Sequence, residues 1–73
     1  MSAYEQWDAL CKEFEVARDA FNTAQGGVTR AFARVAKGTG GNPTEQELDA
    51  AETAWQKLED VKKRMDEFVK ANT

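Results

Sequence analysis

Apolar residues in the first half of the chain recur every three or four positions without interruption. The series is Ala3, Trp7, Leu10, Phe14, Ala17, Phe21, Ala24, Val28, Ala31 and Val35. This spacing is a heptad pattern, which places all these side chains on one face of an α-helix and turns that face toward a neighbouring helix. It predicts one long helix over about residues 3–37 and an all-α fold.

The pair Gly26-Gly27 lies inside this pattern, although two glycines cost a helix roughly 2 kcal/mol relative to alanine. Because the heptad phase continues from Ala24 to Val28, we expect the helix to cross the pair. A bend or a break at the glycines is the alternative. Our hypothesis is that the missing side chains make room for the indole of Trp55, from the same chain or from a partner. Gly27→Ala should then destabilise the fold.

The stretch KGTGGNPTEQEL marks the end of the first helix. Its glycines, asparagine and proline predict a turn over about residues 38–43. Thr44 and Glu47 form a capping box, which predicts a second helix over about residues 44–71. Its inward face is predicted to hold Leu48, Ala51, Trp55, Leu58, Val61, Met65, Phe68 and Val69.

Folding the chain back at this turn gives an antiparallel two-helix hairpin. Counting outward from the turn places Val28 near Trp55, and Phe14 opposite Phe68 or Val69. Each helix begins with acidic residues and ends with basic ones, which complements its macrodipole and the antiparallel pairing. Because the first helix is longer, its first residues should extend beyond the end of the second helix; these are Ala3, Tyr4 and Trp7.

The chain has 73 residues, which allows a single domain. A core of this size rarely supplies more than about 3–5 kcal/mol of stability. Cys11 is the only cysteine and histidine is absent, so neither an internal disulfide nor a zinc site can supplement the core. We therefore predict self-association, most simply as a dimer that forms a four-helix bundle. The predicted interface residues are Tyr4, Trp7, Cys11, Phe14, Phe32, Trp55 and Phe68.

The function predicted from these features is a non-enzymatic protein–protein interaction module, such as an adaptor, a chaperone-like protein or a small regulator. Acid–base catalysis near neutral pH usually needs histidine or a carboxylate with a perturbed pKa in a pocket, so no catalytic, cofactor or metal residue is predicted. The N-terminus lacks a basic segment followed by an apolar run, and no apolar run approaches the roughly 20 residues that span a membrane. The single thiol favours a cytoplasmic location.

Two alternatives stay open beside self-association. A groove on a partner protein could accept one helix face of the hairpin. A dimeric hairpin can also bind nucleic acid through a local basic face, and Arg30, Arg34 and Lys37 line such a face here. The net charge of −3 disfavours a nucleic-acid partner.

The stretch AFARVAKGTGGNPTEQEL resembles the helix–turn–helix of needle subunits of type III secretion systems. In those subunits, too, a helix with a lysine-containing end is followed by Asn-Pro and a new helix. The resemblance covers about a quarter of the chain, and the final residues EFVKANT differ from the long apolar tail of needle subunits. It implies, as a third alternative, a hairpin that acts as a needle subunit or as a small co-chaperone of such a system.

Overall fold

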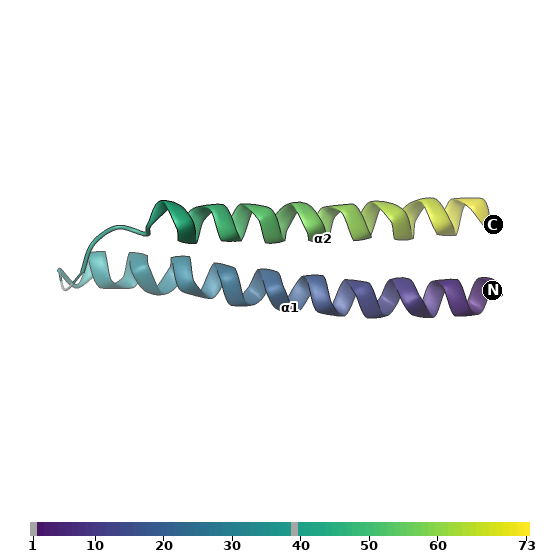
Figure 1. Ribbon diagram of the computed structural model, residues 1–73, viewed down its shortest axis with the longest axis horizontal. Helices are drawn as coiled ribbons and strands as arrows, with labels where there is room; N and C mark the ends of the chain where they lie inside the picture. The colour runs from purple at the N-terminus through teal and green to yellow at the C-terminus, as the bar shows by residue number, and fades with distance from the viewer. Residues whose placement is uncertain (1, 39) are drawn as a thin grey trace.

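The computed structural model describes residues 2–38 and 40–73, which form two antiparallel helices. Helix α1 spans Ala3–Ala36 and helix α2 spans Glu45–Ala71. The two helices pack side by side along their length in a rod of 54 × 17 × 14 Å (Figure 1). The predicted all-α hairpin is confirmed.

Local sequence signals define the helix ends. The Thr44 hydroxyl accepts a hydrogen bond from the backbone N–H of Glu47 at 3.1 Å, and the Glu47 carboxylate accepts one from the N–H of Thr44 at 3.2 Å. This confirms the capping box. Helix α1 ends before Gly38, whose φ of +73° is in the left-handed region. Glycine adopts this conformation without steric cost, and here its N–H donates to the carbonyl of Val35 at 3.0 Å.

Helix α1 continues through Gly26 and Gly27 without a break. The hypothesis that these glycines make room for the indole of this chain's own Trp55 is wrong. A Cβ on Gly27 would meet Glu47 Oε2 at 3.8 Å, and a Cβ on Gly26 would meet the guanidinium of Arg30 at 3.4 Å. Both are ordinary van der Waals contacts with the ends of flexible side chains.

The core lies between the helices and nearer their free ends. Ala17, Leu58 and Val61 form its buried cluster, and Phe14, Phe21 and Met65 pack against it. The apolar residues of α2 that are buried or half-buried again recur every three or four positions; they are Ala51, Ala54, Leu58, Val61, Met65 and Phe68.

Three residues assigned to the inward face of α2 are instead exposed. Leu48, Trp55 and Val69 are 48%, 46% and 45% exposed, while Ala54 is buried. The large indole was a misleading guide to the helix phase, because Ala54 rather than Trp55 continues the regular spacing. A rotation of roughly 100° separates consecutive helical residues, so Trp55 lies beside the helix–helix contact instead of within it.

The two helices are also paired one heptad away from the predicted register. Trp7, not Phe14, stacks on Phe68, with ring centroids 5.7 Å apart. Likewise Phe21, not Val28, contacts Trp55, at 5.3 Å. Each true partner lies two helical turns earlier in α1. A heptad pattern repeats every seven residues, so it defines the contacting face without defining which heptads meet.

This shift reverses the predicted overhang. The N- and C-termini lie at the same end of the rod, so Ala3, Tyr4 and Trp7 do not extend beyond α2 (Figure 1). Instead the last turns of α1 extend beyond the start of α2 at the other end. The connecting segment runs back along α1, where a Cβ on Gly40 would lie only 3.0 Å from the Cβ of Arg34. The prediction assumed a tight turn and therefore missed this return.

Candidate functional site

Several large apolar side chains are exposed along one side of the hairpin. Residues seven positions apart fall on one line of a helix that packs in heptads. Tyr4 and Phe32 share such a line on α1, and Val35 lies beside it. We define the exposed apolar face by the six exposed large apolar residues along these lines, which are Tyr4, Phe32 and Val35 of α1 and Leu48, Trp55 and Val69 of α2.

Trp55 lies midway along this face. Its ring contacts Phe21 of the opposite helix at an interplanar angle of 53°. The ammonium of Lys62 lies 5.9 Å from the indole centroid, and it also pairs with the carboxylate of Glu59 at 3.2 Å. These contacts hold the indole against the hairpin while nearly half of it stays exposed. Such a side chain can contribute a rigid apolar anchor to an interface.

The predicted interface residues divide into two groups. Tyr4 and Phe32 are 79% and 57% exposed, and Trp55 is exposed as well. The other four, Trp7, Cys11, Phe14 and Phe68, are half-buried within the hairpin. Trp7 and Phe68 stack on each other, Phe14 packs on the core, and Cys11 carries a free thiol.

Sequence reasoning missed three members of the exposed apolar face. Val35, Leu48 and Val69 had been assigned to the contact between the helices, yet all three are exposed. The signal that could have found Leu48 and Val69 is the alternative phase of α2. In that phase Ala54 is inward, and positions 48, 55 and 69 share a neighbouring line.

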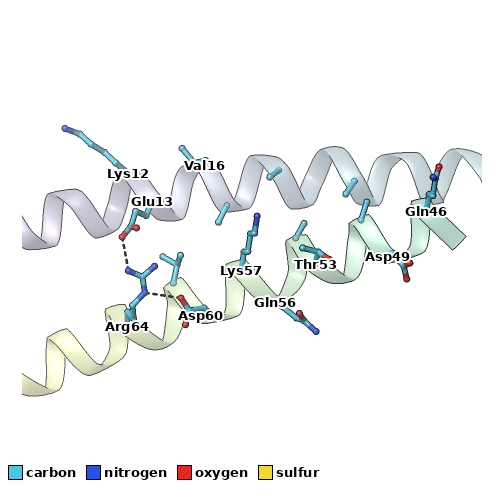
Figure 2. Close-up of a pocket in the computed structure, with 16 residues that line it drawn as sticks. Lys12, Glu13, Val16, Gln46, Asp49, Thr53, Gln56, Lys57, Asp60 and Arg64 are labelled. Atoms are coloured by element: carbon cyan, nitrogen blue, oxygen red, sulfur yellow. Dashed lines mark hydrogen bonds and ion pairs between the residues drawn. The ribbon is translucent and has the colours of Figure 1, made fainter. Parts of the chain in front are cut away.

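A groove with small side chains along its floor lies on the opposite side of the hairpin (Figure 2). Ala17, Ala20 and Ala24 of α1 and Ala50 and Ala54 of α2 line it, and we call it the alanine groove. Among the described residues, the only exposed large apolar side chain that lines it is Val16, which is 71% exposed.

Charged side chains border the alanine groove, and several of them are paired with each other. Arg64 donates to Glu13 across the helices at 3.1 Å and to Asp60 within α2 at 3.2 Å, as the dashed lines in Figure 2 mark. A partner seated here would have to cover these paired charges. The exposed apolar face has the larger share of unburied apolar side chains.

The predicted basic face lies near the turn. Arg30, Arg34 and Lys37 are all exposed. Arg30 and Arg34 belong to the last turns of α1, and Lys37 is the residue that caps its C-terminus. Phe32 lies among them in the sequence and is exposed too, so this end of the rod combines positive charge with an aromatic ring.

Other chemical features of the hairpin are modest. The hydrogen bond from Lys70 to Asp66, with a distance of 2.9 Å, raises the pKa of the exposed Lys70 ammonium. Across residues 2–38 and 40–73, no three histidine, cysteine, aspartate or glutamate side chains are grouped so that they could hold a metal ion. Neither described helix has a stretch that is both long and apolar enough to cross a membrane.

Comparison of this chain with protein-family models, with curated proteins and with solved structures finds no significant match.

Proposed function

We propose that this protein is a non-enzymatic interaction module that self-associates, with a dimeric four-helix bundle as its assembled form. The exposed apolar face is the observation that carries the proposal. Its six large apolar side chains come from both helices and extend along the hairpin. Single exposed apolar side chains are normal on a protein surface. Here six of them fall along neighbouring lines on one side, with Arg18 and Lys62 between them, and such an accumulation is typical of an interaction site.

The surface area of the hairpin supports the same proposal. Its accessible surface is 5413 Å². A compact monomer of 8.1 kDa should expose only about 4500 Å². The excess of about 900 Å² is close to the roughly 800 Å² that each partner buries in an interface of standard size. A second copy packed on one face would bring the exposed area per chain into the ordinary range.

In this form the protein would act as an adaptor, a chaperone-like protein or a small regulator, with other proteins bound to the assembled bundle. The single cysteine favours a cytoplasmic location, since a reducing compartment keeps a lone thiol free. These roles require no catalytic residue, metal or cofactor.

Sedimentation equilibrium of the purified chain over a range of concentrations tests self-association. We expect a mass of twice 8.1 kDa at micromolar concentration, and an unfolding midpoint that rises with protein concentration. A chain that sediments as a monomer and unfolds cooperatively at a concentration-independent midpoint would overturn the proposal.

A matched pair of variants identifies the surface that associates. Leu48→Lys places a charge on the exposed apolar face, and Val16→Lys places one in the alanine groove. Leu48 is about half exposed and Val16 is largely exposed in the single hairpin, so neither change should unfold it. We expect Leu48→Lys to shift the dimer toward monomer and Val16→Lys to leave it intact. The opposite result would assign association to the alanine groove.

Nucleic-acid binding is a second candidate function, and the exposure of Arg30, Arg34 and Lys37, which are spaced three or four residues apart, favours it. Binding of a short RNA duplex that falls steeply with salt would support it. The net charge of −3 opposes a general attraction to nucleic acid, so the cluster would have to act locally.

A further inference from the structure

We propose that the second copy docks on the exposed apolar face with its turn at the opposite end of the rod. The two hairpins would be related by a two-fold axis that crosses their long axes near Arg18 and Leu58. This inference rests on the proposed self-association and adds the geometry of the interface. Such a contact is isologous, which means that the same patch of each copy meets itself.

The exposed line of α1 is self-complementary about Arg18. Positions 4, 11, 18, 25 and 32 are spaced by seven, so reversing the line about its middle places Tyr4 opposite the partner's Phe32. Cys11 then lies opposite the partner's Gln25. The two aromatic rings at the ends of this line, both largely exposed in one hairpin, would cover each other in the dimer.

The corresponding line of α2 is self-complementary as well. It consists of Leu48, Trp55, Lys62 and Val69, and its middle lies between Trp55 and Lys62. Reversal places Leu48 opposite the partner's Val69, and Trp55 opposite the partner's Lys62. The second pair repeats between chains a contact that already exists within each chain, where the Lys62 ammonium lies 5.9 Å from the Trp55 ring.

One axis can serve both lines because their middles lie at the same height along the rod. Ala17 and Leu58 belong to one buried cluster, so the two helices meet at these residues. Arg18 follows Ala17 directly, and Leu58 lies between Trp55 and Lys62 in the sequence. If the helices were paired in the register predicted from sequence, the two middles would be displaced by about two helical turns, or about 11 Å.

The charges near the axis are compensated within each chain. Arg18 pairs with Asp19 at 3.4 Å, and Lys62 pairs with Glu59 at 3.2 Å. Two copies of Arg18 that meet at the axis would therefore each bring a carboxylate with them. The like-charge repulsion that a bare arginine pair would cause is reduced accordingly.

The alternative arrangement, with both turns at the same end, leaves more apolar surface uncovered. It would place α1 against the partner's α2, with Tyr4 opposite the partner's Val69. Phe32 and Val35, however, belong to the last turns of α1. Those turns extend beyond the start of α2 (Figure 1). They would then project past the partner's second helix. The opposed arrangement covers Phe32 with the partner's Tyr4.

Cross-linking of single-cysteine chains tests the arrangement. In a Cys11→Ser background, Tyr4→Cys chains are mixed with Phe32→Cys chains and treated with a short bismaleimide, which joins neighbouring thiols without the strict geometry of a disulfide. Tyr4→Cys mixed with Val69→Cys probes the parallel arrangement, and Val16→Cys alone probes the alanine groove. All four replaced apolar side chains are exposed, so each variant is expected to fold, and circular dichroism verifies this.

We expect efficient joining of Tyr4→Cys to Phe32→Cys, and only background joining in the other mixtures and in each chain alone. Positions 4 and 32 lie about 42 Å apart along one helix, so Tyr4→Cys should not join to itself. Efficient joining of Tyr4→Cys to Val69→Cys would overturn the opposed arrangement, and joining through Val16→Cys would overturn the choice of face. Sedimentation of the same variants distinguishes failure of the proposed arrangement from failure of the proposed self-association. A dimer that lacks the Tyr4→Cys to Phe32→Cys cross-link refutes only the arrangement, whereas a monomer refutes self-association itself.

Discussion

The two ends of the hairpin are built differently. In the half of the rod that contains the termini, the buried cluster of Ala17, Leu58 and Val61 joins the helices near the middle of the rod, and Trp7 stacks on Phe68 closer to the termini. The ion pair between Glu13 and Arg64 crosses between the helices in the same half. We call this the terminal half. Its contacts involve both helices and large side chains.

The turn half, between Gln25 and Thr53, contains fewer such contacts. Ala31 is fully buried there, but Phe32, Val35 and Leu48 are exposed. Gly26 and Gly27 also lie in this half and supply no side chains to the contact between the helices. Stability within one protein is not uniform and follows the density of buried apolar contacts. The comparison therefore indicates that the terminal half supplies most of the contacts that hold the two helices together.

The largest expected effect is that of Leu58→Ala in the terminal half. Leu58 belongs to the buried cluster, and removing a buried leucine side chain typically costs about 2–5 kcal/mol. Because a chain of this size has little stability in reserve, we expect the variant to lose most of its cooperative unfolding. Urea titration followed by circular dichroism at 222 nm measures the change in the free energy of unfolding.

Leu48→Ala is the matched control in the turn half. Leu48 is only about half buried in one hairpin, so removing its side chain from a monomer should cost no more than about 1 kcal/mol. If a second copy covers Leu48, the cost should become larger at protein concentrations at which the dimer forms. Equal losses for Leu48→Ala and Leu58→Ala at low micromolar concentration would contradict the difference between the two halves.

Replacing the glycines of the Gly26-Gly27 pair by alanine should raise the stability of the hairpin, whereas the leucine substitutions lower it. Gly26 and Gly27 are helical, and added methyl groups would meet only ordinary contacts at 3.4 and 3.8 Å. Each change to alanine should therefore stabilise the hairpin by about 0.5–1 kcal/mol through helix propensity. Thermal melts of the two single variants and of the double variant measure this.

Gly38→Ala is the control for that prediction. Gly38 has a φ of +73°, where an alanine costs roughly 1–2 kcal/mol, so this variant should melt at a lower temperature. A lower melting temperature for Gly27→Ala would indicate that something outside the single hairpin packs against the glycines. In a dimer, that contact would belong to the partner.

The sequence was sufficient for the fold class because the signals for it are local. The 3–4 spacing defined the face of α1, and Thr44 with Glu47 defined the start of α2. Phase and register in α2 were harder to predict. Trp55 is large enough to suggest an inward position, yet the smaller Ala54 occupies it. The regular spacing through Ala54 favours the observed phase, but the size of Trp55 favours the other one.

The register required information that no local pattern contains. Seven-residue repeats can pair at several offsets, and stacking of Trp7 on Phe68 selects one of them. The residues of the candidate interface depended instead on the phase of α2. Tyr4 and Phe32 were identified as exposed from the first helix alone, whereas Leu48 and Val69 became members of the exposed apolar face only after the phase of α2 was known.

The smallest expected effect is that of the ion pair between Glu13 and Arg64, which sharpens the comparison because it joins the helices only in the terminal half. Both side chains are about half exposed, so solvent screens the pair, and its coupling energy should lie between about 0.2 and 1 kcal/mol. A double-mutant cycle with Glu13→Gln and Arg64→Gln, repeated at about 0.05 and about 0.5 M salt, should give a coupling energy that falls as the Debye length shortens.

The control is the pair of Lys70 with Asp66, which lies within α2 and does not connect the helices. Loss of the control pair should lower helix content near the C-terminus without separating the helices. Tryptophan fluorescence measures whether the Trp7–Phe68 contact is lost in each variant. If both cycles gave the same coupling energy and the same loss of this contact, the ion pair across the helices would contribute no more to the terminal half than a pair within one helix.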